Sequence, residues 1–192
     1  MIGMSLIPVM MGWPIMLMPV HILVLQLIID PTCSLVFEAE PEESDVMSRP
    51  PRSPDASIFA RVILVKGALQ GLALLATVLA TFWLALQANI GNEPARALAF
   101  TSMVVGNIGL IFINRSLSQR VVGALALPNP SLWWVTASAV LILCAGLFIP
   151  ALNGLFYFGH PELKHIALSV LASLACIALL AWVKSRGYLR VI

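Results

Sequence analysis

An aspartate inside a long apolar stretch is the residue of this sequence best suited to chemistry. The stretch runs from Pro14 to Phe37, and Asp30 stands within it, with Gln26 four residues before and Ser34 four residues after. Side chains four apart share one face of a helix, so an amide, a carboxylate and a hydroxyl form a polar stripe on an apolar segment. A carboxylate at membrane depth is costly and usually marks an ion or proton path. The stripe therefore predicts a cation site at Asp30.

The residue after this aspartate, Pro31, predicts an interruption of the helix. Proline has no N–H and its ring crowds the preceding turn, so backbone carbonyls beside Asp30 would become further oxygen ligands. The alternative is a buried acid that pairs with a neighbouring helix for structure alone. The adjacent break favours the ion site over this alternative.

The composition identifies the class of protein in which this aspartate stands. Of the 192 residues, 60% are hydrophobic and 10% are charged, which excludes a soluble globular domain because such domains carry about 25% charged residues. We therefore expect an integral membrane protein whose partner is the lipid bilayer and not a nucleic acid. The three cysteines fall far apart inside apolar runs and indicate neither a disulfide framework nor a zinc site.

The apolar stretches predict an all-α membrane protein, a bundle of five full transmembrane helices preceded by a partial N-terminal helix. Each full span needs about 20 apolar residues to cross a bilayer. The chain is expected to form one transmembrane domain over residues 1–192. Its predicted elements are a partial helix at 1–12, spans at 14–37, 62–86, 95–113, 132–152 and 166–183, and a loop at 38–61.

Four further residues inside these spans have local interpretations. His21 lies near the outer end of the first full span, where we expect it at the membrane interface. Gly67 and Gly71 form a small-xxx-small pair suited to close helix contact, with chance glycines as an equal alternative. Asn107 places an amide in mid-membrane, and such amides usually hydrogen-bond to another helix.

The basic residues predict the orientation of the bundle. If the spans alternate in direction, nine of the eleven Lys and Arg residues share one side, and only Arg96 and Lys164 lie on the other. Cytoplasmic loops of membrane proteins carry the excess of Lys and Arg. The loop at 38–61 and the C-terminus are therefore predicted to be cytoplasmic, in a multi-pass protein of the cell membrane. The nine residues are Arg49, Arg52, Arg61, Lys66, Arg115, Arg120, Lys184, Arg186 and Arg190.

Several short motifs follow one another around Asp30. A G-x-P turn leads to a P-V-x-x-L helix start, the aspartate follows, and the string D-x-M-x-R-P-P-R comes after it. This order resembles the fifth-to-sixth helix region of bacterial P-type cation-transporting ATPases of the calcium-pump type. The stretch from Ala99 to Ser116 is similar to the eighth helix of that family, so the resemblance covers essentially the whole chain as the C-terminal third of the membrane domain. The matching positions are Gly12, Pro14, Pro19, Val20, Leu23, Asp30, Asp45, Met47 and Arg49 to Arg52.

The resemblance implies a set of cation ligands. In calcium pumps the sixth helix supplies an amide, a threonine and an aspartate, and here Gln26, Ile29 and Asp30 stand at those positions, while Asn107 replaces the glutamate of the eighth helix. The fifth-helix acid falls at or near Met1. Calcium prefers six to eight oxygens with enough negative charge, so one carboxylate with amides suits a monovalent ion or a proton better. The resemblance therefore implies a cation site made by Asp30, Gln26 and Asn107.

The motifs that drive a P-type pump do not occur in this sequence. These are the aspartyl-phosphate motif D-K-T-G, the T-G-E loop and the G-D-G-x-N-D hinge. We expect that the chain alone is not an enzyme, has no catalytic residue and holds no cofactor, so that Mg²⁺ and ATP would act only with the missing domains. The leading hypothesis is the C-terminal transmembrane domain of a cation pump, as a truncated gene product or as one half of a split pump whose N-terminal half is encoded separately.

Two hypotheses from other classes remain open. One is a non-enzymatic membrane subunit that binds another membrane protein through its helices, with Asp30 merely paired. The other is a small channel or exchanger, which is weaker because the chain has one intramembrane acid and no internal repeat. An upstream reading frame that encodes D-K-T-G would favour the pump over both.

Overall fold

The computed structural model describes residues 2–40, 61–115 and 129–186, and at residues 28–33 and 61–62 it describes the backbone but not the side chains. Within these residues the chain forms helices and no strand, which confirms the predicted all-α class. The helices are α1 (Ile2–Met10), α2 (Pro19–Glu38), α3 (Arg61–Gln87), α4 (Asn92–Asn114), α6 (Pro130–Phe148), α7 (Pro150–Phe156) and α8 (Leu163–Ser185).

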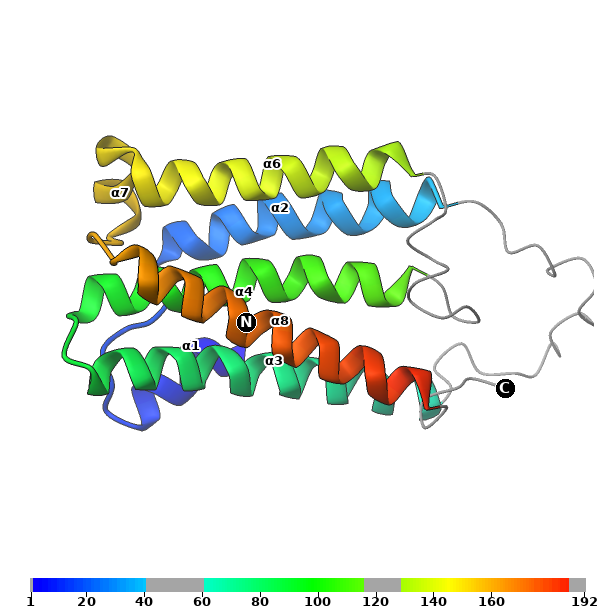
Figure 1. Ribbon diagram of the computed structural model, residues 1–192, viewed down its shortest axis with the longest axis horizontal. Helices are drawn as coiled ribbons and strands as arrows, with labels where there is room; N and C mark the ends of the chain where they lie inside the picture. The colour runs from blue at the N-terminus through cyan, green and yellow to red at the C-terminus, as the bar shows by residue number, and fades with distance from the viewer. Residues whose placement is uncertain (1, 41–60, 116–128, 187–192) are drawn as a thin grey trace, which may run out of the picture.

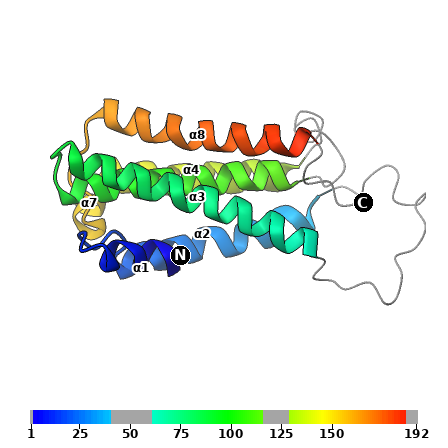
Figure 2. The same ribbon diagram turned by 90° about the horizontal axis from the view of Figure 1, so that it is seen from below.

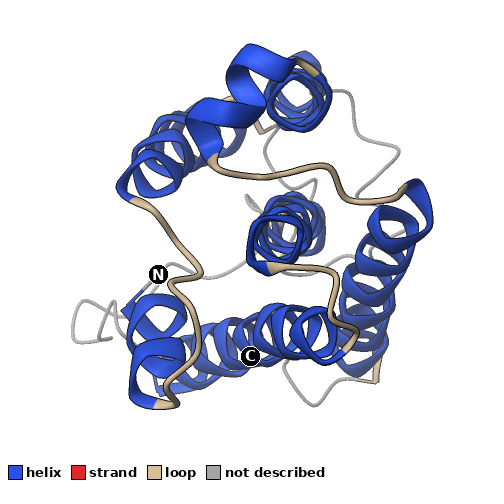
Figure 3. Ribbon diagram, turned by 90° about the vertical axis from the view of Figure 1, so that its left-hand side faces the viewer, coloured by secondary structure: helices blue, strands red, loops and turns tan. Residues whose placement is uncertain are grey.

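The long helices lie side by side in one bundle, with α4 at its centre. Figures 1 and 2 show α2, α3, α4, α6 and α8 running along the same axis, with the short α7 at one end. Seen along that axis, one helix is surrounded by the others (Figure 3), and its packing against α2, α3, α6 and α8 identifies it as α4. Accordingly, 56% of the most apolar stretch of α4 is buried inside the bundle, whereas 28% or less of the corresponding stretch is buried in α3, α6 and α8.

Four helices in the described part of the chain are long and apolar enough to cross a membrane. They are α3 from Ile63 onward, α4, α6 and α8. Together they make the chain a multi-pass membrane protein. The remaining predicted span, at 14–37, corresponds to α2, whose side chains at 28–33 lie outside the described residues, so the predicted count of five full spans is not confirmed. The predicted loop at 38–61 also lies largely outside the described residues.

The α2 helix corrects the predicted interruption beside Asp30. It is continuous from Pro19 to Glu38 and passes through Pro31 without a break. A proline in a helix removes one backbone hydrogen bond, here the one to the carbonyl of Leu27, and the bonds on either side can keep the helix intact. The helix begins at Pro19 rather than at residue 14, because Pro19 occupies the first helical position, where a missing N–H costs nothing.

The predicted span at 132–152 is divided into two helices. The α6 helix ends at Phe148, Ile149 adopts an extended conformation, and α7 begins at Pro150. Proline restricts the residue before it to extended conformations and starts a new helix readily. The chain therefore turns at Ile149, and the seven residues of α7 cover one end of the bundle (Figure 1).

Two glycines of α4 allow its close packing at the centre. A Cβ atom at Gly106 would overlap the side chain of Leu74 of α3, and one at Gly109 would lie 2.6 Å from Ile177 of α8. The suggested contact pair on α3, Gly67 and Gly71, is different, because a Cβ atom at either position would have nothing within 4 Å. Of these four glycines, Gly106 and Gly109 on the central helix α4 therefore lie at close helix contacts, and Gly67 and Gly71 on α3 do not.

Candidate functional site

The three predicted ligands occupy different environments on α2 and α4. The side chain of Asp30 lies outside the described residues, although its backbone is part of α2. Gln26 is exposed, and position 30 follows it four residues later on the same side of the helix. Asn107 is half-buried on α4. The side of α2 that carries positions 26 and 30 is therefore accessible at Gln26.

The end of the bundle that carries α7, called here the α7 end, holds a buried histidine. His21 has no exposed surface, which corrects its predicted place at the membrane interface. Its ring lies 5.2 Å from that of Phe100 on α4 and 5.0 Å from that of Phe158. The backbone N–H of Met18 donates to its Nδ1 atom, so Nε2 carries the hydrogen and donates to the carbonyl of Phe156 at 2.7 Å. Both ring nitrogens are satisfied by backbone groups, so the histidine can be buried without a charged partner.

Arg96 joins three segments at the same end. It lies in the first turns of α4, and its Nη1 donates to the carbonyl of Tyr157 at 2.8 Å. Its Nε and Nη2 both donate to the carbonyl of Ile15 at 3.2 Å. Only 6% of Arg96 is exposed, and carbonyl oxygens are the partners of its guanidinium in the described residues. The central helix thereby holds the segment before α2 and the segment after α7.

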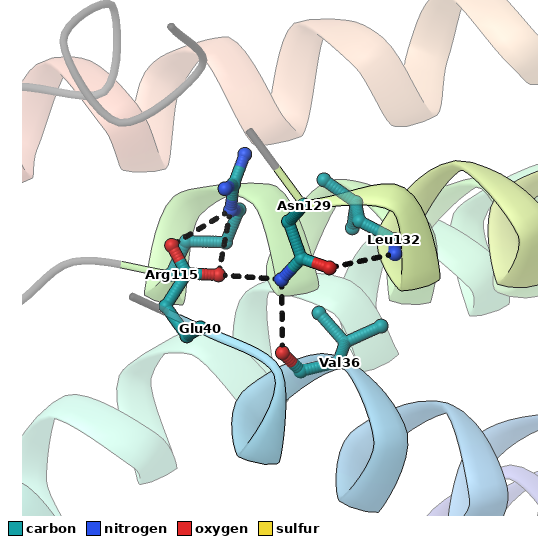
Figure 4. Close-up of polar contacts among 5 residues, drawn as sticks. All are labelled: Val36, Glu40, Arg115, Asn129 and Leu132. Atoms are coloured by element: carbon teal, nitrogen blue, oxygen red, sulfur yellow. Dashed lines mark hydrogen bonds and ion pairs between the residues drawn. The ribbon is translucent and has the colours of Figure 1, made fainter. Parts of the chain in front are cut away.

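The opposite end, called here the Glu40 end, holds a polar cluster formed by residues at the ends of three helices (Figure 4). The Nε atom of Arg115 donates to both carboxylate oxygens of Glu40, at 3.2 and 3.0 Å. Asn129 donates from Nδ2 to Glu40 at 2.9 Å and to the carbonyl of Val36 at 3.0 Å. Its Oδ1 accepts from the N–H of Leu132, which makes it the N-cap of α6. The side chains of Arg115 and Glu40 are 1% and 13% exposed, so this is a buried ion pair.

These contacts fix the depth of α2 relative to α4. The two helices meet at the ring contact near the α7 end and at the ion pair near the Glu40 end. Asp30 comes nine residues after the first contact and ten before the second, and Asn107 comes seven after and eight before. Because a helix rises about 1.5 Å per residue, positions 30 and 107 lie at similar depth, midway between the contacts.

A second set of polar contacts joins α4 to α3 and α8. Gln70 and Asn114 exchange two amide hydrogen bonds, of 3.2 and 3.0 Å. The hydroxyl oxygen of Ser102 lies 3.2 Å from two acceptors, the Oγ1 of Thr81 and the carbonyl of Ser169, and Ser173 donates to the carbonyl of Ser102. These groups satisfy one another between helices, which is the usual structural role of small polar residues in membrane bundles.

The residues that hold α2 in place are hard to find from the sequence. In the sequence, Glu40 is one acid among several in a charged stretch, and Arg115 is one basic residue of a predicted loop. Their pairing across 75 residues leaves no local pattern. Asn129 does have a signal, because an asparagine directly before a proline is typical of a helix N-cap followed by its first residue.

No three His, Cys, Asp or Glu side chains among those described come together as a metal site. The arrangement is instead a bundle of apolar helices with an amide at mid-depth on α4, that of Asn107, and polar contacts at both ends. This geometry defines a multi-pass membrane protein of the α-helical bundle class.

Comparison with known proteins identifies the family within that class. Residues 14–186 match the family described as "Cation transporting ATPase, C-terminus", and the chain belongs to this family. A protein of Bacillus subtilis (strain 168) named "Calcium-transporting ATPase" is 28% identical over 154 residues, which cover 79% of this chain and 17% of that protein. The resemblance to the C-terminal membrane region of P-type cation pumps is thereby confirmed.

Proposed function

We propose that this chain supplies part of the transmembrane cation site of a P-type pump, with Asp30 as the principal ligand and Gln26 and Asn107 as further oxygen donors. The observation that carries the proposal is the depth of α2 relative to α4. Positions 30 and 107 lie midway between two contacts that hold these helices together, at the depth where a transported cation must lose water. Oxygen ligands from protein are needed there to replace the hydration shell.

The site is completed by groups from another membrane segment. Gln26 is exposed on α2, and position 30 shares its side of the helix. Polar groups within a membrane helix face the protein interior and not lipid. This side of α2 is therefore an inner wall of the cation path, and the chain carries one portion of the ligand set.

Energy for transport comes from domains that this chain does not contain. The Bacillus subtilis relative is a calcium-transporting ATPase, and the chain spans 17% of its length. ATP hydrolysis and phosphorylation take place on the remaining portion of the complete pump, in one polypeptide or in two. Phosphorylation then changes the arrangement of the helices, so that the cation site between them is exposed alternately to the two sides of the membrane.

The test is the Asp30→Asn substitution in the complete pump reconstituted in liposomes. ATPase activity is measured with added Ca²⁺, Na⁺ or K⁺ and across pH, to find the cation that stimulates the unmodified protein. Asp30→Asn should abolish that stimulation, because it removes the carboxylate that offsets the cation's charge. The matched control is Glu93→Gln, which neutralises an exposed acid at the start of α4 and should leave stimulation unchanged. Full stimulation in Asp30→Asn would remove Asp30 from the site.

A further inference from the structure

The buried cluster of Glu40, Arg115 and Asn129 occupies a particular place in the chain. Glu40 lies just after α2, Arg115 is the C-cap of α4, and Asn129 is the N-cap of α6. Residues 41–60 follow the first of them, and residues 116–128 connect the other two. The cluster thus joins the ends of three helices (Figure 4).

The contacts that Arg115 and Asn129 make with other helix ends converge on the end of α2. The carboxylate of Glu40 accepts from Arg115 and from Asn129, and the carbonyl of Val36, in the last turn of α2, accepts from Asn129 as well. Two donors to Glu40, the Nε of Arg115 and the Nδ2 of Asn129, and one hydrogen bond to the Val36 carbonyl hold both the position and the rotation of this helix end. The Nε–H of Arg115 is shared between the two carboxylate oxygens of Glu40, and such a charge-assisted hydrogen bond is directional, whereas apolar packing is not.

We propose that Glu40, Arg115 and Asn129 are positioning residues for the cation site. They hold α2 at one depth and rotation against α4, and so set the separation between Asp30 on α2 and the amide of Asn107. This inference rests on the proposed function and adds to it the residues that determine cation affinity from a distance. The continuous α2 helix carries the constraint over the ten residues from Glu40 to position 30.

The arrangement of the remaining polar contacts supports this role over a general stabilising one. Gln70 and Asn114 make a reciprocal amide pair near the same end of the bundle, but this pair joins α3 to α4 and does not touch α2. Removal of either set of contacts should weaken the bundle. Only removal of the cluster should release α2, so only that change should alter cation affinity.

The test compares variants of the complete pump in liposomes. The assay uses whichever of Ca²⁺, Na⁺ and K⁺ stimulates the ATPase activity of the unmodified pump. Glu40→Ala and Arg115→Ala should each raise the cation concentration for half-maximal ATPase activity, K0.5, by about five- to tenfold, with maximal activity near that of the unmodified pump. The double variant should be no worse than either single one, because the two side chains act as a unit. Gln70→Leu is the matched control and should leave K0.5 unchanged.

A further variant separates helix capping from the anchoring of α2. In Asn129→Ser a hydroxyl oxygen still accepts from the N–H of Leu132, but the Nδ2 donor to Glu40 and Val36 is lost. We expect K0.5 to rise in this variant while the thermal unfolding temperature stays close to that of Gln70→Leu. If Glu40→Ala, Arg115→Ala and Asn129→Ser lower the unfolding temperature and leave K0.5 unchanged, the cluster is structural only and the inference is wrong.

The Asp30→Asn variant, measured in parallel, distinguishes this inference from the proposed function. Loss of stimulation in Asp30→Asn with an unchanged K0.5 in Glu40→Ala overturns the positioning role and leaves the cation site in place. An effect of Glu40→Ala without an effect of Asp30→Asn overturns the ligand assignment and, with it, the inference that the cluster acts by setting the separation between Asp30 and Asn107.

Discussion

The Nε2 atom of His21 donates a 2.7 Å hydrogen bond to the carbonyl of Phe156, a residue 135 positions later in the chain. This contact joins the start of α2 to the end of α7, and the rings of His21 and Phe156 stack with 7° between their planes. The imidazole therefore acts as a neutral aromatic group with one donor and one acceptor, both used. It is part of the packing that holds α2 at the α7 end.

The first prediction concerns the stability supplied by this histidine. His21→Ala should lower the stability of the bundle by about 2 kcal/mol or more, because it removes two hydrogen bonds and leaves a cavity among aromatic rings. For a chain of this size that corresponds to a fall in melting temperature of roughly 4–8 °C. Thermal unfolding of the purified protein in detergent, followed by circular dichroism, measures the change.

Two variants control this measurement. His160 is exposed, so His160→Ala should change stability by less than about 0.5 kcal/mol. His21→Phe keeps the ring packing and removes both hydrogen bonds, so its effect should lie between those of the two alanine variants. An equal effect of His21→Ala and His160→Ala would contradict the buried position of His21.

The second prediction concerns the close contact between α4 and α8. In Gly109→Ala the new Cβ would lie 2.6 to 2.9 Å from three side-chain atoms of Ile177. Ile177 is β-branched and has little rotamer freedom in a helix, so the helices must separate, at a cost of about 1–3 kcal/mol. Gly71→Ala introduces a methyl group with nothing within 4 Å and should be neutral or slightly stabilising.

The same contact can be tested by a compensating change. Ile177→Ala should recover part of the stability lost in Gly109→Ala, because the methyl group then has room. The coupling between the two substitutions, obtained from the melting temperatures of the unmodified protein, the two single variants and the double variant, should be clearly different from zero. Additive effects would show that Gly109 and Ile177 do not meet.

The third prediction concerns orientation in the membrane. The helices place Arg115, Lys184 and Arg186 at the Glu40 end and leave Arg96 and Lys164 at the α7 end. The excess of Lys and Arg favours the cytoplasm for the Glu40 end. Green fluorescent protein fused after Ile192 should therefore fluoresce in bacterial cells, and alkaline phosphatase inserted after Gly159 should be active. If green fluorescent protein at the C-terminus does not fluoresce and alkaline phosphatase fused there is active, the orientation is the opposite of the predicted one.

The sequence by itself determined the class of the protein and the places of most helices. Apolar stretches of about 20 residues have few stable structures other than membrane helices, because each backbone polar group must bond within its own segment. The motifs around Asp30 also identified the family, which the match over residues 14–186 confirms. Asp30, Gln26 and Asn107 as ligands remain a prediction, because these assignments depend on side-chain geometry that sequence patterns do not contain.

Only the tertiary structure decided which residues hold the bundle together. Whether a proline breaks a helix depends on the packing around it, and α2 continues through Pro31. Whether a histidine is interfacial or buried depends on partners such as Phe156, and whether a glycine is a contact depends on which helix is central. The pairing of Glu40 with Arg115 arises from the meeting of two helix ends that lie 75 residues apart. Such contacts are set by the spatial arrangement of helices, and no local pattern in the chain encodes them.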